Sequence, residues 1–495
     1  MPAIAAAVLV FLSSAAVLVL EILAARLLAP YVGVTLEVYT AIIGTILAGI
    51  AFGSWWGGRW ADRRDPRQLI GPFLVVGGGL SFMTIPVVDA LGTGLRGAGA
   101  LTTVVLTFAA FFAPATVLTA VTPAVIKLEL ADLAQTGRVV GRLSAVGTAG
   151  AIIGTFVTGF LLVAAVPTRP TIRVVAAFLV LLGIATAAWL HGGRRATSAG
   201  TIVAVLFAGA FSFAARHPCD HESAYYCARI EVDADDPSGR SLVLDTLRHS
   251  YVDLDDPTHL EFTYIQWFGD VITAVAPDGA PVDALHIGGG GYTMPRYLRA
   301  AHQGSASTVL EVDPLLVELA HDELGLEPGA DIETLVGDAR LTIGEVQADT
   351  YDLVINDAFG GVSVPWHLAT REFLDQVDDA ATDDAVMVAN VIDYGPRDFL
   401  RAYVATTRAV FDHVAVVGRP GSFAGRDARG LGGNFVMIAS DAPLPLDDIR
   451  EANRRGGRDA EVLAGGDLDE FVGDAAVLTD DYAPVDQLLT PLPDG

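Results

Sequence analysis

Seven long apolar stretches fill the first 215 residues of the chain and limit its possible folds more than any other feature. A helix of about 20 apolar residues crosses the bilayer core, which is about 30 Å thick. The first stretch has no basic n-region and six more follow it, which excludes a signal peptide. The sequence therefore predicts a multi-span α-helical membrane domain over residues 1–215, in a cell membrane, with about seven transmembrane helices: 4–23, 39–57, 69–89, 101–121, 143–166, 172–190 and 199–215.

The rest of the chain has the opposite character. Residues 1–215 carry 13 basic and 7 acidic residues, whereas residues 216–495 carry 18 basic and 51 acidic residues, a net charge of −33. Such a balance argues against a nucleic-acid partner, because phosphate contacts need clustered Lys and Arg. Lys127 is the single lysine among 31 basic residues. Adaptation to high salt, typical of an acidic proteome, and a GC-rich genome that favours arginine codons both explain this bias.

Small residues recur along the apolar stretches at spacings that let helices approach closely. They are Gly44, Gly49 and Gly53, and Gly147, Gly150 and Gly154. Charged residues near the end of the first stretch, Glu21 and Arg26, either serve a function or neutralise each other. The segment 57–64 resembles the loop motif of major facilitator transporters, but seven spans are fewer than the usual twelve. A membrane anchor is therefore preferred over a transporter.

From residue 282 the pattern alternates between strands and helices, which is typical of a mostly parallel sheet covered by helices. A short apolar strand, 284–287, leads directly into the glycine run 288–291, and a helix follows. Glycines in this turn let the backbone approach a ligand. The next strand ends near Glu311, 20 residues after Gly291, a spacing that suits a carboxylate binding ribose hydroxyls.

Two further acids follow successive strands of this predicted sheet. Asp338 follows the third strand and suits an adenine amino group, and Asp357 follows the fourth, where ligands bind in open α/β sheets. Thr293 replaces the third glycine of the dinucleotide motif, which argues against a nicotinamide cofactor. Each acid alone could be a helix cap, but three at successive strand ends indicate a binding site.

These motifs together resemble the spermidine synthase (polyamine aminopropyltransferase) family, in particular its membrane-fused relatives, over about residues 220–490. The matching segments are 222–225, 242–245, 261–264, 288–291, 311–314, 337–339, 356–359, 370–373 and 478–484. The resemblance implies a small N-terminal β-domain at 216–280 and a Rossmann-like domain, similar to S-adenosylmethionine methyltransferases, at 281–495.

The resemblance also implies a reaction, in which an amine attacks decarboxylated S-adenosylmethionine and receives its aminopropyl group. It implies a diamine such as putrescine as acceptor, and no prosthetic group. Asp357 would be the catalytic base, with Tyr264 as its hydrogen-bonding partner. The donor would be held by Gly288, Gly289, Gly290, Glu311 and Asp338.

Most departures from the family pattern fall on residues that would hold the aminopropyl amine of the donor and the diamine acceptor. Gly291 and Gly360 stand where relatives carry acids, and His249 stands where a glutamine is expected. His249 is read either as a surface residue or as a substitute base. Two other functions therefore stay open: another S-adenosylmethionine-dependent transferase such as a methyltransferase, and a non-catalytic module that senses adenosyl or polyamine ligands for a transporter-like membrane protein. The sequence shows no cluster with metal-ligand spacing, so no metal is expected.

The side of the membrane on which residues 216–495 lie is predicted from the basic residues of the loops, which concentrate in the cytoplasm. Alternate loops carry nine and four, which puts the N-terminus inside and, after seven spans, the acidic part outside. Cys219 and Cys227 could pair in a disulfide there, or remain buried thiols. The cytoplasmic origin of adenosyl donors and putrescine argues for the opposite side. A homo-oligomer is left open.

Overall fold

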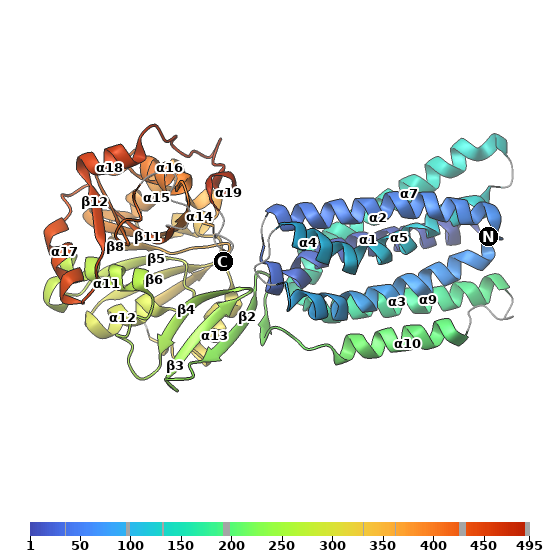
Figure 1. The fold of residues 1–495 in the computed structure, drawn as a ribbon, viewed down its shortest axis with the longest axis horizontal. Helices are drawn as coiled ribbons and strands as arrows, with labels where there is room; N and C mark the ends of the chain where they lie inside the picture. The colour runs from blue at the N-terminus through green and yellow to red at the C-terminus, as the bar shows by residue number, and fades with distance from the viewer. Residues whose placement is uncertain are drawn as a thin grey trace. The chain divides into compact units, whose positions relative to one another are not determined.

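A computed structural model describes residues 1–34, 36–95, 100–130, 133–191, 199–329, 331–361, 363–424 and 432–490. The chain divides into two compact units, Met1–Ala228 and Arg229–Gly495. Figure 1 shows a helical N-terminal unit and a C-terminal unit built around β-sheet.

The N-terminal unit is made of long apolar helices. Its elements are α1 (Ala3–Val32), α2 (Leu36–Arg63), α3 (Arg67–Gly92), α4 (Ala100–Thr107), η1 (Phe108–Phe112), α5 (Ala113–Thr119), α6 (Val121–Glu129), η2 (Leu133–Gln135), α7 (Thr136–Val157), η3 (Thr158–Leu162), α8 (Val163–Ala165), α9 (Thr168–His191) and α10 (Ala199–Ala214). Within the described residues, six helical segments are long and apolar enough to cross a membrane. The count differs from the predicted seven because α10 has only 16 residues, fewer than the roughly 20 that span a bilayer core.

Close helix contacts explain the small residues of this unit. A side chain at Gly53 would meet the backbone of Thr116 at 2.3 Å, and one at Gly150 would meet the backbone of Phe11 at the same distance. Only glycine lets these helix pairs approach so closely. Gly44 has no such neighbour within 4 Å, so its predicted packing role is wrong.

A four-stranded sheet, in the order β1-β2-β3-β4, precedes the main sheet. Its strands are β1 (His221–Glu222), β2 (Cys227–Val232), β3 (Gly239–Leu244) and β4 (Leu247–Asp253). β2 contains the boundary between the two units. β3 and β4 form an antiparallel hairpin, and β4 contributes residues to the site described below.

The main sheet has eight strands in the order β12-β10-β11-β9-β8-β5-β6-β7, of which β7, β6, β5, β8 and β9 are parallel to one another. The strands are β5 (Asp283–Ile287), β6 (Ala306–Glu311), β7 (Ile332–Val336), β8 (Tyr351–Asn356), β9 (Ala381–Tyr394), β10 (His413–Gly418), β11 (Gly432–Ser440) and β12 (Glu461–Ala464). The predicted mostly parallel sheet is confirmed for its central part, while β11, β10 and β12 add antiparallel pairings at one edge.

Helices cover both faces of this sheet, as Figure 1 shows. They are α11 (Thr263–Val275), η4 (Pro277–Gly279), α12 (Thr293–Ala301), α13 (Pro314–Asp322), α14 (Ala339–Thr342), η5 (Ile343–Glu345), η6 (Trp366–Leu368), α15 (Arg371–Ala380), α16 (Asp398–Thr407), α17 (Leu446–Arg455), α18 (Gly465–Val472) and α19 (Val485–Leu488). Alternate residues of β8 enter two cores: Leu353 and Ile355 pack with α11 and α12, and Val354 packs with α15 and α16. Successive side chains of a strand point to opposite faces of the sheet, and both faces are covered here. The central strands are therefore continuous apolar runs in the sequence.

Candidate functional site

The candidate site lies at the carboxyl end of β5, where the strand order reverses. β5 pairs with β6 on one side and with β8 on the other, and both pairings are parallel. This is the topological switch point, at which open α/β sheets bind ligands. The glycine run that follows β5 and Asp357, which follows β8, therefore meet at the same edge of the sheet.

Gly288 makes this meeting possible. Its φ of +93° lies in a region that favours glycine, and a side chain there would be 2.8 Å from the backbone oxygen of Asp357. The amide of Gly288 donates to the carbonyl of Leu310, and the amide of Asp357 donates to the carbonyl of Ile287. The turn is thus hydrogen-bonded to both neighbouring strands, and its backbone borders Asp357.

The Asp357 carboxylate accepts two side-chain hydrogen bonds. The Tyr264 hydroxyl, in the first turn of α11, donates to Oδ2 at 3.1 Å, and Asn390 Nδ2, from β9, donates to Oδ1 at 2.9 Å. Asn434 Nδ2 in β11 donates in turn to Asn390 Oδ1 at 3.0 Å. Both oxygens of Asp357 are therefore held by groups from two different elements, α11 and β9, and β11 holds the Asn390 amide in turn.

Burial dominates the acidity of this carboxyl group. It raises the pKa of Asp357 from its ordinary value of 3.8 to about 6, while the bonds from Asn390 and Tyr264 act in the opposite direction. Burial and the neighbouring Asp357 charge raise the pKa of the Tyr264 phenol well above its usual value, so this hydroxyl remains a donor at neutral pH. A carboxylate with a pKa near 6 is poised to accept a proton close to physiological pH.

A cavity of about 450 Å³ opens beside these groups. Its lining includes the predicted residues Tyr264, Asp357, Gly288, Gly289 and Gly290. Charged, polar and aromatic side chains complete the wall: Arg248, His249, Ser250, Tyr251, Glu261, His286, Asn390, Tyr394, Arg419 and Asn434. Five of the seven residues predicted from the sequence therefore surround one cavity of a size suited to a small molecule.

Glu311 accepts hydrogen bonds from the backbone of the glycine turn. It is not among the described residues that line the cavity. Its Oε2 accepts from the amides of Gly289 and Gly290 at 2.8 and 3.2 Å, and its Oε1 accepts from the amide of Asp313 at 2.9 Å. Burial raises the pKa of Glu311, and these three bonds partly offset that effect. The residue thus organises the turn directly.

Asp338 lies apart from the cavity lining. It caps α14 by accepting from the amide of Arg340 at 2.9 Å, and its Oδ2 is 3.1 Å from His367 Nε2. The capping interpretation of this acid is therefore correct, and it still leaves one carboxylate oxygen facing His367. His367 belongs to the short helical turn η6.

His249 lines the cavity, which corrects its interpretation as a surface residue. Burial lowers its pKa to about 4, so the imidazole is neutral at physiological pH and is a weak base. Sequence reasoning missed Ser250, Asn390 and Asn434. An asparagine inside the apolar run of β9 is a signal that could have revealed Asn390, because a buried amide needs a partner.

The glycine turn carries no acid and has no space for one at its last position. The amide of Gly291 donates to Ser250 Oγ at 2.9 Å, and a side chain at residue 291 would lie 2.8 Å from Ser250 Cβ. Gly360, the other position at which relatives carry an acid, is not among the described residues that line the cavity. Across the described part of the chain, no group of three or more His, Cys, Asp or Glu residues is arranged to hold a metal ion.

A glycine turn and a buried carboxylate at the switch point of a largely parallel sheet define a Rossmann-like ligand-binding domain. Comparison with known proteins finds sequence similarity to two aminopropyltransferases. The chain is 28% identical over 169 residues to a polyamine aminopropyltransferase of Vibrio vulnificus, covering 33% of this chain and 52% of that protein. It is 28% identical over 222 residues to a probable polyamine aminopropyl transferase of Bifidobacterium longum, and the match covers 41% of this chain and 48% of that protein.

The resemblance to the spermidine synthase family is thereby confirmed. The chain spans about half the length of these curated relatives. A probable spermidine synthase from Corynebacterium glutamicum is a structural neighbour with 25% identity and a TM-score of 0.49, covering 55% of this chain and 98% of that one. No family model matches the chain.

Proposed function

We propose that the chain is a membrane-anchored transferase of the spermidine synthase type, which moves an aminopropyl group from decarboxylated S-adenosylmethionine to a diamine such as putrescine. The observation that carries the proposal is the hydrogen-bonded pair of Asp357 and Tyr264 in the cavity beside the glycine turn. The names of the sequence relatives support the same chemistry.

The proposed division of labour follows the sequence domains. Residues 1–215 would anchor the protein in the lipid bilayer, residues 216–280 would form the small β-domain, and residues 281–495 would bind the adenosyl ligand. The long apolar helices of the N-terminal unit support the anchor. The contribution of β4 to the cavity wall supports a role for the small β-domain in the site.

Glu311 is the proposed partner of the donor ribose. A carboxylate offers about four lone-pair positions, and three backbone amides occupy three of them. One position therefore remains for a ribose hydroxyl, and the same residue fixes the glycine turn that would pass beneath the sulfonium. Asp338, next to His367, is the proposed partner of the adenine amino group.

Asp357 is the proposed catalytic base. The lone pair of the acceptor amine attacks the methylene carbon beside the sulfonium, a new C–N bond forms, and the C–S bond breaks. The bond electrons remain on sulfur, which leaves neutral methylthioadenosine. The amine nitrogen loses one proton to Asp357, whose carboxylate also attracts the cationic acceptor before the reaction. Tyr264 and Asn390 hold the carboxylate in place for this transfer.

The decisive experiment compares Asp357→Asn with the unaltered full-length chain in detergent. We expect turnover to fall by about 10²–10⁴-fold, because the shape is kept and the base is lost, while donor binding measured by calorimetry is retained. Asp378→Asn is the matched control, since burial also raises the pKa of Asp378 to about 6 and it lies outside the described lining of the cavity. Equal activity of Asp357→Asn and the unaltered chain would exclude Asp357 as the base.

Methyl transfer from S-adenosylmethionine is the second candidate. The crowded position of Gly291 against Ser250 leaves no space for an acid there. This favours methyl transfer, because S-adenosylmethionine carries a carboxylate that its decarboxylated form lacks, and an acid at this end of the turn would repel it. The two reactions leave different nucleosides. Mass spectrometry of the products therefore separates them: methylthioadenosine indicates aminopropyl transfer, and S-adenosylhomocysteine indicates methyl transfer.

A further inference from the structure

The helical unit has two distinguishable ends, which its internal contacts identify. α7 runs in the same direction as α1, because Gly150 packs against Phe11 and Gly154 packs against Ala15. The starts of both helices therefore lie at one end. Arg142, near the start of α7, is 3.6 Å from Glu129 at the end of α6. We call this the basic end.

The C-terminal part of α1 lies at the opposite end. The 30 residues of α1 extend about 45 Å at about 1.5 Å each. Near its end, Tyr31 donates to Asp89 Oδ1 at 2.8 Å, and Arg26 donates to the carbonyls of Ser223 and Ala224. Residues 223–224 therefore lie at the end of the unit remote from the start of α1, which requires an odd number of passes.

The short helix α10 supplies the seventh pass. α9 starts beside Asp89, where Arg169 forms an ion pair with it, and the same guanidinium donates to the carbonyl of Arg216, just after α10, at 2.9 Å. The start of α9 and the residue after α10 thus lie together. α10 packs mainly against α3, where Gly79 faces Val205, and Arg173 Nη2 of α9 donates to the Ser212 carbonyl at 2.6 Å.

Charge distinguishes the two ends. Seven basic residues among those described occur near the basic end: Arg59, Arg63, Arg64, Arg67, Lys127, Arg138 and Arg142. Four occur near the other: Arg26, Arg169, Arg173 and Arg216. Of the loop residues counted from the sequence, Arg96, Arg194 and Arg195 lie outside the described residues. Because Lys and Arg accumulate in cytoplasmic loops, the basic end is assigned to the cytoplasm.

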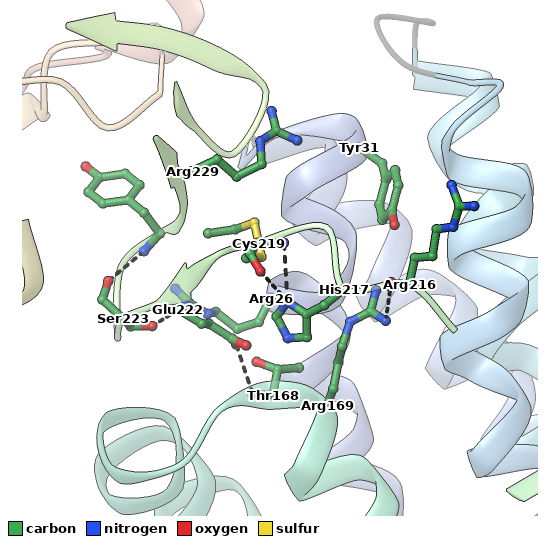
Figure 2. The surroundings of a disulfide bond; sticks show 12 residues. Arg26, Tyr31, Thr168, Arg169, Arg216, His217, Cys219, Glu222, Ser223 and Arg229 are labelled. Atoms are coloured by element: carbon green, nitrogen blue, oxygen red, sulfur yellow. Dashed lines mark hydrogen bonds between the residues drawn. A yellow bond between two sulfur atoms is a disulfide. The ribbon is translucent and has the colours of Figure 1, made fainter. Parts of the chain in front are cut away.

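A disulfide marks the opposite end. Cys219 and Cys227 are bonded, with their Cα atoms 5.2 Å apart, and they close the segment that follows α10. Figure 2 shows how the helix ends hold this segment: Arg26 reaches the carbonyl of Ser223, and Glu222 accepts from the amide of Thr168 at 2.9 Å. Disulfides persist in oxidising compartments and are rare in the cytosol. The bond and the charge distribution are independent, and they agree.

We propose that the disulfide end of the helical unit faces the oxidising, extracytoplasmic side, and that Cys219–Cys227 closes the segment there. No further candidate span follows α10 in the described part of the chain. The C-terminal unit then takes its small-molecule ligands from outside the cytoplasm. This assignment does not depend on which group is transferred. It runs against the cytoplasmic origin of adenosyl donors, so the supply of donor on that side is a consequence of the proposal.

The test places single cysteines in the full-length chain after Cys219→Ser and Cys227→Ser. Asp65→Cys reports on the exposed loop between α2 and α3 at the basic end, and Asp235→Cys reports on the exposed loop after β2. In intact cells a membrane-impermeant maleimide should label Asp235→Cys fully and Asp65→Cys only after permeabilisation. The reverse pattern, or labelling of both only after permeabilisation, overturns the proposal.

A second measurement uses the unaltered chain and avoids any effect of the substitutions on folding. Cells are quenched with acid, and thiols are then reacted with a maleimide carrying a large polymer. We expect no gel shift without reductant and a shift of two polymer units after reduction, because both cysteines are bonded. Two units added without reductant would contradict an oxidising location. Neither readout involves catalysis, so failure of the proposed transfer reaction would leave both results unchanged.

Discussion

The Asp357 carboxyl group is balanced between two opposing effects. Burial favours its neutral form, and the donors Tyr264 and Asn390 favour its anion. With a pKa of about 6, the group is mostly ionised at pH 7 and still able to hold a proton briefly. An exposed aspartate would be a weaker base, and loss of the two donors would raise the pKa of the buried carboxyl group further. The two hydrogen bonds therefore tune the proposed base.

Tyr264→Phe tests this tuning. The ring is kept and one donor to Asp357 is lost, so the pKa of Asp357 should rise by about one unit, the equivalent of a hydrogen bond to a charged group. Activity requires the ionised carboxylate, so it grows as pH rises through that pKa. The acid limb of the pH–rate profile should move from about pH 6 to higher pH. Activity at pH 6 should fall about fivefold, and activity at pH 8 should change least.

Tyr351→Phe is the matched control for this experiment. Tyr351 is also buried and donates a hydrogen bond, to Thr308 at 3.0 Å, outside the cavity lining. Its acid limb should coincide with that of the unaltered chain. An unshifted limb in Tyr264→Phe would show that the hydroxyl does not influence the base.

Asp357→Asn should also stabilise the fold at alkaline pH. The pKa of Asp357 is raised on folding from 3.8 to about 6, so its favourable contribution is complete below pH 3.8 and is lost as pH rises through 6. A neutral amide does not suffer this loss. The gain at pH 8 has an upper bound of about 3 kcal/mol, at about 1.36 kcal/mol per unit, and it should shrink towards pH 4. Thermal melts of both chains at the two pH values measure it.

Asp378→Asn separates stability from catalysis in the same melts. Burial and the neighbouring carboxylates of Asp441, Asp379 and Asp375 raise the pKa of Asp378 to about 6. This variant should therefore gain stability at pH 8 as well, but keep its activity. If neither variant is more stable at pH 8, burial of these two ionised carboxylates has little effect on the free energy of unfolding.

At the scale of elements, the turn after β5 is the part of the fold that most closely ties sequence to site. Its first glycine has a positive φ and borders the backbone of Asp357. Gly288→Ala should strain the turn and displace Asp357, at a cost of about 1–3 kcal/mol in stability, with a loss of activity larger than the loss of stability explains. Gly344→Ala is the control, since no atom lies within 4 Å of the added carbon. Melting curves and steady-state rates of both variants decide between them, and unchanged rates in Gly288→Ala would contradict the close approach.

Strands of the central sheet were predictable because their signal is local. The predicted strand 284–287 is β5 without its first residue, and the next predicted strand, which ends near Glu311, is β6. Apolar runs bounded by turn residues mark such buried strands. The position of Asp357 followed from the same rule. These elements need no knowledge of distant partners.

The partners of the site residues were not predictable, because they depend on long-range pairing. Asn390 and Asn434 meet only because β9 and β11 pair antiparallel in one register. Glu311 has the spacing of a ribose ligand, but the same spacing brings it to the amides of Gly289 and Gly290. Thr370 and Asp480, both in predicted motifs, form a hydrogen bond of 2.7 Å with each other outside the cavity lining. Sequence spacing identified these residues and did not distinguish their roles.

At the scale of the whole molecule, the number of candidate membrane spans depends on a single helix, α10. Hydropathy predicted seven spans, but only six helical segments are long enough, because α10 is too short by the criterion of length alone. In the proposed topology α10 is a seventh pass, because the contacts of Arg169 and Arg26 bring the start of α9, the residue after α10 and the end of α1 to one end of the unit. Length is a poor guide for a helix that packs against neighbours, since tilt and local bilayer thinning adjust the fit.

The charge of the molecule leads to a final prediction about salt. The whole chain has a net charge of −27, and residues 216–495 account for −33. Repulsion between carboxylates weakens the compact state, and added salt screens it, since the Debye length falls from about 30 Å at 0.01 M to about 3 Å at 1 M. The melting temperature at pH 7.5 should therefore rise steadily with NaCl and level off near 1 M. At pH 4.5, close to the isoelectric point, the same salt series should have a much smaller effect, because most of the net charge is gone. Scanning calorimetry of the purified chain at both pH values measures the two slopes. Equal slopes would show that salt acts through burial of apolar surface and not through screening of the acidic residues.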